Sequence, residues 1–148
     1  MSKRSKKGPT PPAAVIVHSL DQARTAARMA AAGGRDLDLR SGPGAGAYAG
    51  GGWWTALVAQ VAAEFPGLAL RGVLDCDDDA GAAMAALRAG VIHLAFAGPP
   101  ALRRRVADLA AQSGAEIVDI GEPALDLGGL APGADLAAAC REWLDANR

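Results

Sequence analysis

The sequence predicts one α/β domain built around a parallel sheet, and three observations carry this prediction. Its 148 residues suit a single domain, because single domains commonly span about 100–200 residues. Hydrophobic residues make up 51% of the chain but aromatic residues only 4%, which indicates aliphatic strands covered by alanine-rich helices. From Ala13 onward, short apolar segments alternate with longer helical ones, a pattern typical of consecutive β/α units. We expect five such units within residues 13–148.

The first unit consists of a strand over 13–19 and a helix over 21–34. Asp21 is expected to cap this helix, because an aspartate side chain accepts hydrogen bonds from the free N–H groups of a first turn. The glycine pair at 33–34 marks the end of the helix.

The second unit has a glycine-rich segment between its strand, over 36–42, and its helix. The helix is predicted from apolar residues that recur on one stripe, Trp53, Leu57, Val61 and Phe65. The Pro-Gly pair at 66–67 stops it.

The other three units repeat this order. Their strands are predicted over 68–75, 91–98 and 115–121, and their helices over 79–90, 99–114 and 134–147. Asp79 is the expected cap of the first of these helices, and the Pro99–Pro100 pair fits the first turn of the second. A connection from Glu122 to Gly133 precedes the last helix.

Two architectures fit this pattern, a flavodoxin-like open sheet and a truncated TIM-type barrel. Both bind ligands at the carboxyl ends of their strands. Those ends carry His18–Ser19, Arg40–Ser41, Asp75–Asp77, Gly98–Pro99 and Gly121–Glu122. We therefore expect function at this edge in either case.

Charge is unevenly distributed along the chain. Lys3, Arg4, Lys6 and Lys7 give residues 1–12 a charge of +4, so the body carries about −5 of the formal net charge of −1. This balance argues against a nucleic-acid surface on the body. The basic, proline-containing tail over 1–12 is expected to be disordered, since it has little apolar surface to bury.

The sequence has no apolar run of the roughly 20 residues that a membrane span needs and no apolar segment after its basic start. Its two cysteines, Cys76 and Cys140, form no CxxC pair and are expected to be free thiols. Together these features predict a cytoplasmic protein without membrane contact.

Four segments, "VIVHSLDQARTAARMAAAGGRDLDLRS", "AEFPGLALRGVLD", "ALRAGVIHLAF" and "AAQSGAEIV", occur in the order and spacing of 2-keto-3-deoxy-6-phosphogluconate aldolases. The chain resembles this family of (β/α)8 class I aldolases over roughly residues 13–121. The resemblance implies that Asp36 stands where the family has its general-base glutamate, and Arg40 where it has the arginine for the substrate carboxylate. The family forms a Schiff base on a lysine, whereas lysine occurs here only at 3, 6 and 7. Class I aldolase activity is therefore not expected.

Asp36 and Arg40 also have interpretations that do not depend on the resemblance to aldolases. Asp36 is either a shortened base or a surface charge that opens a strand. Arg40 lies at a strand end beside a glycine loop, where a guanidinium suits a carboxylate or phosphate, or it serves structure only.

The glycines Gly44, Gly46 and Gly50 lie between a strand and a helix, as in dinucleotide-binding loops. The spacing is not G-x-G-x-x-G, the Walker lysine is absent, and Asp75 follows Gly44 by 31 positions where about 20 is usual for the ribose-binding acid. The loop is either an anion or nucleotide cradle or a mobile connection, with Tyr48 as a lid contact or an exposed side chain.

The acidic run Asp75 and Asp77–Asp79 suggests either a divalent metal or ordinary helix capping, and capping is favoured. His18 ends a strand at the expected functional edge and is either an acid or base or a structural residue, whereas His93 is expected to be a hydrogen-bonded core residue. Ser19, Ser41 and Cys76 have no activating partner that the sequence reveals. No metal or cofactor is predicted.

These observations predict a non-catalytic or vestigial aldolase-like protein that binds a small anionic ligand at the carboxyl ends of its strands. The candidate ligand residues are Arg40, Ser41, Gly44, Gly46, Asp36, Asp75 and His18. The alternatives are a lyase or isomerase acting on a small keto acid or sugar phosphate, with or without a metal, and a nucleotide-binding module using Gly44–Gly52. Whether the protein is an enzyme is left open.

A homodimer is also predicted. Part of a barrel would leave an open edge, and two apolar helix stripes would then need a covering layer. The stripes are Trp53, Leu57, Val61 and Phe65 on one helix and Leu136, Cys140, Trp143 and Leu144 on the last.

Overall fold

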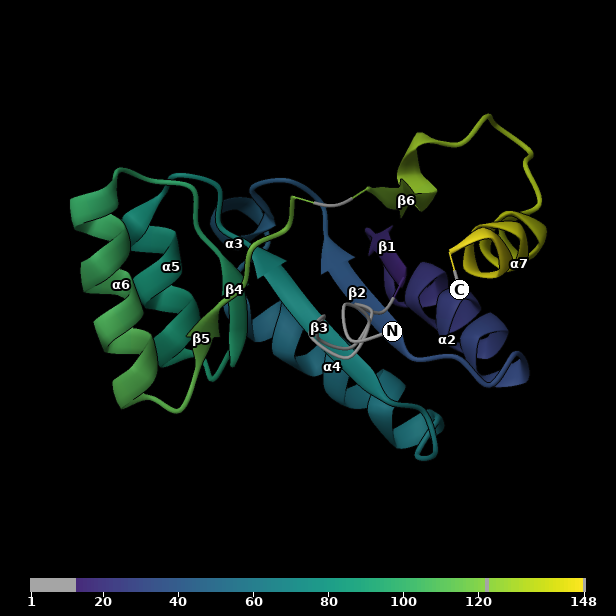
Figure 1. Cartoon of the computed structure of the whole chain (residues 1–148), viewed down its shortest axis with the longest axis horizontal. Helices are drawn as coiled ribbons and strands as arrows, with labels where there is room; N and C mark the ends of the chain where they lie inside the picture. Colours follow the sequence, from purple (N-terminus) through teal and green to yellow (C-terminus); the bar gives the residue numbers. More distant parts are fainter. Residues whose placement is uncertain (1–12, 122, 148) are drawn as a thin grey trace, which may run out of the picture.

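The structure, a computed structural model, describes residues 13–121 and 123–147, so the predicted tail over 1–12 lies outside the described residues. Six strands form one sheet in the order β5-β4-β3-β2-β1-β6, and every neighbouring pair is parallel (Figure 1). Helices alternate with the strands along the chain. The α/β class predicted from the sequence is confirmed.

The strands are β1 (Ala13–Val17), β2 (Leu37–Ser41), β3 (Leu70–Asp75), β4 (His93–Ala95), β5 (Glu116–Ile117) and β6 (Ala124–Asp126). The helices are α2 (Leu20–Ala32), α3 (Ala45–Tyr48), α4 (Gly51–Glu64), α5 (Ala80–Arg88), α6 (Pro100–Gln112) and α7 (Leu136–Ala146), with a 3-10 turn η1 (Leu127–Gly129) after β6.

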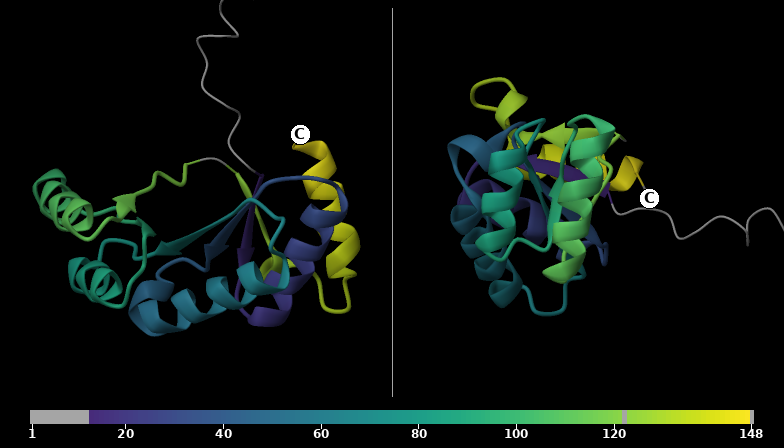
Figure 2. Two further views of the ribbon diagram at one scale, coloured as in Figure 1. Left: turned by 90° about the horizontal axis from the view of Figure 1, so that it is seen from below. Right: turned by 90° about the vertical axis from the view of Figure 1, so that its left-hand side faces the viewer.

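Strands β1 to β5 lie side by side in chain order. This is the order of strands in a barrel, and it differs from the flavodoxin order 2-1-3-4-5. Right-handed crossovers that always step in the same direction place their helices on one face of the sheet. Figure 2 shows the helices in an arc on one side of the sheet, while residues 118–121, after β5, lie near the carboxyl ends of β3 and β4. The sheet stays open, with β5 and β6 at its edges.

The sixth strand lies inside the predicted connection from Glu122 to Gly133. It pairs with the free edge of β1, with Ala14 opposite Ala124 and Ile16 opposite Asp126. The strand has only three residues, which are too few to show a period of two, and it lies between a proline and a glycine pair, so the sequence pattern indicates a loop here.

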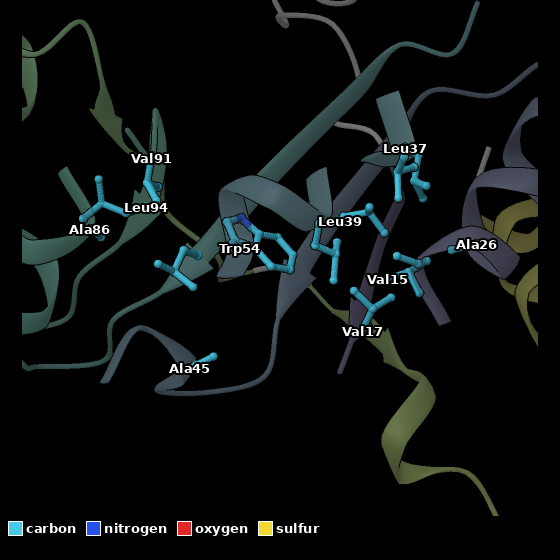
Figure 3. Packing of buried hydrophobic residues seen from close by; sticks show 14 of the residues in the cluster. Val15, Val17, Ala26, Leu37, Leu39, Ala45, Trp54, Ala86, Val91 and Leu94 are labelled. Atoms are coloured by element: carbon cyan, nitrogen blue, oxygen red, sulfur yellow. The ribbon is translucent and has the colours of Figure 1, made fainter. Parts of the chain in front are cut away.

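The sheet separates two kinds of side chain. On the face toward the helices, which we call the outer face, strand residues such as Leu39, Val17 and Leu94 pack against helix residues including Trp54 and Ala26 (Figure 3). The opposite face, the inner face, carries Asp38, Arg40 and Arg71, because side chains of a strand alternate between faces. The apolar core therefore lies between the outer face of the sheet and the helices that cover it.

The short helix α3 was not predicted, and α7 begins at Leu136, two residues later than predicted. The cap of α2 also differs from the prediction. Ser19, not Asp21, is its N-cap, and the Ser19 hydroxyl accepts the N–H of Gln22 at 3.1 Å. The strand ends two residues earlier than predicted, which frees Ser19 for this role. Asp79 caps α5, as predicted, by accepting the N–H of Ala82 at 2.9 Å.

Both helix stripes invoked for the homodimer are covered within the chain. On α4 the buried residues are Gly51, Trp54, Leu57 and Val61, whereas Trp53 and Phe65 of the predicted stripe are half-buried. On α7 Cys140 and Leu144 are buried, and the Trp143 indole donates to the Ala14 carbonyl at 2.9 Å. The stripes therefore no longer require a second copy, and the homodimer stays a prediction.

None of the helices within residues 13–121 and 123–147 is both long enough and apolar enough to cross a membrane.

Candidate functional site

Asp38 joins two arginines on the inner face. Its Oδ1 accepts Nε of Arg71 at 2.6 Å and its Oδ2 accepts Nη2 of Arg71 at 3.0 Å, a two-point contact made possible because the two residues are paired across β2 and β3. Arg40 Nε lies 3.4 Å from Asp38 Oδ2. Asp38 is 1% exposed and Arg40 4% exposed. Arg40, the predicted anion ligand, is thus part of an ionic cluster of Asp38, Arg40 and Arg71, in which Asp38 and Arg40 are buried and Arg71 is partly exposed.

Asp36 lies apart from this cluster. It precedes β2, at the amino end of the sheet, and its side chain is exposed. It lines a cavity of about 360 Å³ that also includes Arg35 and Phe65. Asp38 and Arg40 share the inner face, but Asp36 lies too far from the carboxyl end of the strand to act with groups at that edge.

A larger cavity lies at the carboxyl edge, as both predicted architectures require. It has a volume of about 490 Å³, and the ends of β3 and β4 and residues 118–121 line it. Its charged lining consists of the carboxylates of Asp75, Asp77 and Asp119 and the guanidinium of Arg103. We call this space the edge cavity.

Arg103 is held in place inside the edge cavity. It reaches from α6 to donate from Nη1 to the Phe96 carbonyl at 2.8 Å and from Nη2 to Asp119 Oδ1 at 2.9 Å. A guanidinium has five N–H donors, and these contacts use two of them among the described residues. Arg103 was not predicted as a site residue from the sequence, because it lies in a helix and only the tertiary fold brings it to the strand ends.

Hydrogen bonds with Ser41 and with the backbone N–H of Asp77 hold Asp75 in place. The Asp75 N–H donates to Ser41 Oγ at 2.8 Å, and Ser41 Oγ donates to the Gly42 carbonyl at 3.1 Å. Asp75 Oδ1 accepts the N–H of Asp77 at 2.7 Å. Ser41 is buried, so it links β2 to β3 and does not reach a ligand.

The acidic run fits the capping interpretation. Asp79 caps α5, and Asp77 and Asp78 are exposed. Within residues 13–121 and 123–147, no three His, Cys, Asp or Glu side chains are arranged to hold a metal ion.

The glycine segment forms a folded turn with its N–H groups directed inward. Ala45 and Ala47 donate to the carbonyls of Gly42 and Gly44, and Gly50 donates to Ala45. Gly44 has φ of 72°, which favours glycine. At Gly46 a Cβ would lie 2.7 Å from the Cys76 sulfur, so this glycine serves packing against β3. Within the part of the chain that the structure describes, no side chain caps the first turn of α4 at the end of this segment, so an anion or nucleotide cradle here stays a prediction.

His18 pairs with a residue that the sequence pattern assigned to a connection. Its Nε2 lies 2.7 Å from Asp126 Oδ1, which also accepts the N–H of Gly128 at 2.8 Å. The imidazole lies between Gly42 and Gly128, where a Cβ would fall 2.7 Å from Cε1 and 2.6 Å from Cδ2 respectively. A carboxylate on one ring nitrogen orients an imidazole and leaves the other nitrogen to act as an acid or base. The pair also connects β1 to β6.

His93 lies at the start of β4, on the inner face, with Nε2 3.4 Å from Glu116 Oε1 of β5. Its side chain is 23% exposed, so it is a polar contact between neighbouring strands at the margin of the fold.

Both cysteines are free, as predicted, and the structure also shows that both are buried. Burial, together with the nearby carboxylates of Asp75 and Asp79, raises the pKa of Cys76 to about 12. Burial also raises the pKa of Cys140 to about 11. Neither thiol ionises near neutral pH, and thiolate is the reactive form, so neither is a nucleophile.

Comparisons with models of protein families and with curated proteins found no match to this chain.

Proposed function

We propose that this chain is a non-catalytic, vestigial aldolase-like protein that binds a small carboxylate in the edge cavity. The ligand is expected to carry hydroxyl or ammonium groups as well. One observation carries the proposal: Arg103 is pre-positioned by Phe96 and Asp119 in a cavity at the carboxyl ends of parallel strands. That edge is where ligands of such sheets bind, and about 300–1,000 Å³ is the usual size of a small-molecule site.

The charges of the edge cavity narrow the ligand class. A guanidinium with remaining donors suits a carboxylate, since the two groups match in shape and charge. Asp75 and Asp77 are acceptors and favour hydroxyl or ammonium groups on the rest of the ligand. Three carboxylates against one guanidinium oppose a multiply charged phosphate. A hydroxy acid, a sugar acid or an amino acid satisfies these constraints.

The likeness to aldolases supports the vestigial part of this proposal. The consecutive order of β1 to β5 agrees with the expected barrel-type arrangement. The Schiff-base lysine is missing from residues 13–148. We expect borohydride trapping in the presence of pyruvate to leave the mass of this part of the chain unchanged, and a covalent adduct there would contradict the proposal.

A thermal-shift screen tests ligand binding, because a ligand that binds only the folded state stabilises it by about 2.7 kcal/mol at one hundred times Kd. Gluconate, lactate and alanine represent the proposed ligand class, with glycerol and inorganic phosphate as comparisons. We expect one of the carboxylates to raise Tm and glycerol and phosphate to leave it unchanged.

Arg103→Gln should abolish this rise in Tm. Arg105→Gln is the matched control, because Arg105 is exposed on the same helix and does not line the edge cavity. No rise with any of the three carboxylates, or an equal rise in the Arg103→Gln protein, would contradict the proposal.

A second candidate function is acid–base catalysis by His18, favoured by its short contact with Asp126 at the end of β1. Its substrate would be a small keto acid, whose α-protons an oriented imidazole can exchange. Deuterium exchange into pyruvate, followed by NMR, tests it. Catalysed exchange that His18→Gln abolishes would establish an enzyme and displace the binding role. Exchange no faster than in buffer would eliminate this candidate.

The homodimer and the cytoplasmic location belong to the proposal as predictions. Free buried thiols at Cys76 and Cys140 agree with a reducing compartment. Sedimentation analysis tests the dimer, and a monomer at all concentrations would eliminate it.

A further inference from the structure

A second cavity lies on the outer face, away from the edge cavity. It is a groove of about 220 Å³ between α4 and the turn that leads from α5 into β4. Its walls are Trp54, Thr55, Val58, Ala59 and Ala62 of α4, Gly72 of β3, and Gly90, Val91 and Ile92 of the turn. We call it the α4 groove. It carries no ionisable side chain among the described residues.

Gly72 lets Val58 and Trp54 of α4 pack closely against β3 at the floor of the α4 groove. Gly72 contributes no side chain to its floor, and a Cβ there would fall 2.5 Å from Val58 Cγ2 and 3.4 Å from Trp54 Nε1. Gly90 has φ of 92°, a conformation that disfavours larger residues, so the turn at the rim keeps its shape. Ile92, at the rim, is 57% exposed, which is unusual for a side chain of its size and polarity.

Two hydrogen-bond donors in the groove wall have no partner among the described residues. They are the indole Nε1 of Trp54 and the hydroxyl of Thr55, and both atoms are buried. Trp54 as a whole is 2% exposed, and Figure 3 shows its six-membered ring toward Leu39 and its nitrogen on the other side. By contrast, the indole of Trp143 donates to the Ala14 carbonyl. An unpaired buried donor costs about 1–3 kcal/mol, so an acceptor supplied from outside would offset a penalty already present in the fold.

We propose that the α4 groove binds an uncharged, single-ring apolar molecule whose carbonyl oxygen accepts the Trp54 indole N–H. The size follows from the volume, since a cavity of about 150 Å³ holds benzene. The ligand is expected to be uncharged, because no ionisable side chain in the described part of the chain lines the groove and a buried ion without a partner is strongly disfavoured. The ligand is expected to have a carbonyl because its oxygen can accept a hydrogen bond from an unpaired donor in the groove wall.

Nuclear magnetic resonance on the full chain tests this proposal, with acetophenone as the probe. The indole N–H resonance of Trp54 is assigned by its loss in Trp54→Phe. We expect a saturable downfield shift of this resonance, while the Trp53 and Trp143 signals stay near their positions. α-Methylstyrene, which replaces the carbonyl by a carbon–carbon double bond, should bind about three- to tenfold more weakly, the effect of one hydrogen bond.

Two variants in which leucine replaces an alanine of α4 test whether the shift of the Trp54 resonance arises from binding in the groove. Ala59→Leu fills the groove from an exposed position and should abolish the shift, whereas Ala63→Leu, exposed on the same helix but outside the groove, should preserve it. No saturable shift with acetophenone, equal affinity for α-methylstyrene, or a shift that survives Ala59→Leu would overturn the proposal. A shift of the Trp54 signal with protein concentration alone would also overturn it, by showing that a second copy covers the groove.

Discussion

The two faces of β2 differ in chemistry, although the side chains on both are buried. On β2, Leu37 and Leu39 face the helices and are 0% exposed, while Asp38 and Arg40 face inward and are 1% and 4% exposed. Strands of parallel sheets covered on both sides are usually apolar throughout. Here one face has the packing of a core and the other has ion pairs and hydrogen bonds. Because side chains alternate along β2, apolar packing and polar contacts lie on separate faces of the same strand.

The energetic consequences of a substitution should therefore depend on the face it touches. A truncation on the outer face leaves a cavity, whose cost depends on lost apolar contacts. A truncation on the inner face leaves charges or donors without their partner, which costs desolvation that is no longer compensated.

The largest effect is expected for Asp38→Ala. It removes the carboxylate that Arg40 and Arg71 share, and breaking a buried ion pair commonly costs about 3–5 kcal/mol. Urea unfolding measures the change, with Asp108→Ala as a control because Asp108 is exposed on α6. A loss in Asp38→Ala no larger than in this control would mean that the inner cluster contributes no stability.

Leu39→Ala probes the outer face of the same strand. Its loss should be about 2–5 kcal/mol, the range for a buried leucine, and should not depend on salt concentration. Unfolding at low and high salt measures this, because ionic interactions respond to screening and apolar packing does not. A salt-dependent loss would contradict the separation of the two faces.

Ser41→Ala should have a smaller effect, about 1–3 kcal/mol. It removes the oxygen that accepts the Asp75 N–H and so leaves a donor without this partner. The same unfolding experiment measures it, and amide exchange at Asp75 should accelerate in the variant. Unchanged exchange would show that another group holds this strand end.

The smallest effect is expected at a surface ion pair remote from both faces. Hydrogen bonds from Arg24 and Gln60 lower the pKa of Glu64 from 4.5 to about 2. A depressed pKa stabilises the fold above the unfolded value and loses this contribution as pH falls toward 2. Unfolding between pH 5 and 2 should thus depend less steeply on pH in Glu64→Gln than in the unchanged protein, and equal slopes would contradict this role.

Local signals predicted the parts of this structure that depend on neighbours in sequence. The alternation from Leu37 to Arg40, the cap at Asp79 and the Pro99–Pro100 helix start are of this kind. The choice of Trp54 over Trp53 as the buried ring depends on how α4 lies on the sheet, which its uniformly apolar sequence does not specify.

The site depends on contacts that no local pattern encodes. Asp38 meets Arg71 only through the register of β2 with β3. His18 meets Asp126 only because a three-residue strand returns to the edge of β1. Arg103 reaches the edge cavity from a helix that the sequence marks only as amphipathic. The sequence thus predicted a site at the carboxyl edge with Asp75 in it, but not Arg103 or Asp119, which also line the edge cavity.

The central claim is that the edge cavity, and not the glycine segment or the amino end, receives the ligand. A map of backbone amide shifts during titration with the carboxylate that raises Tm most tests it directly. We expect the perturbed amides to lie in residues 75–77, 95–97 and 118–121, with Arg103→Gln removing the perturbation. Shifts confined to residues 42–52 or to the cavity around Asp36 would contradict the claim.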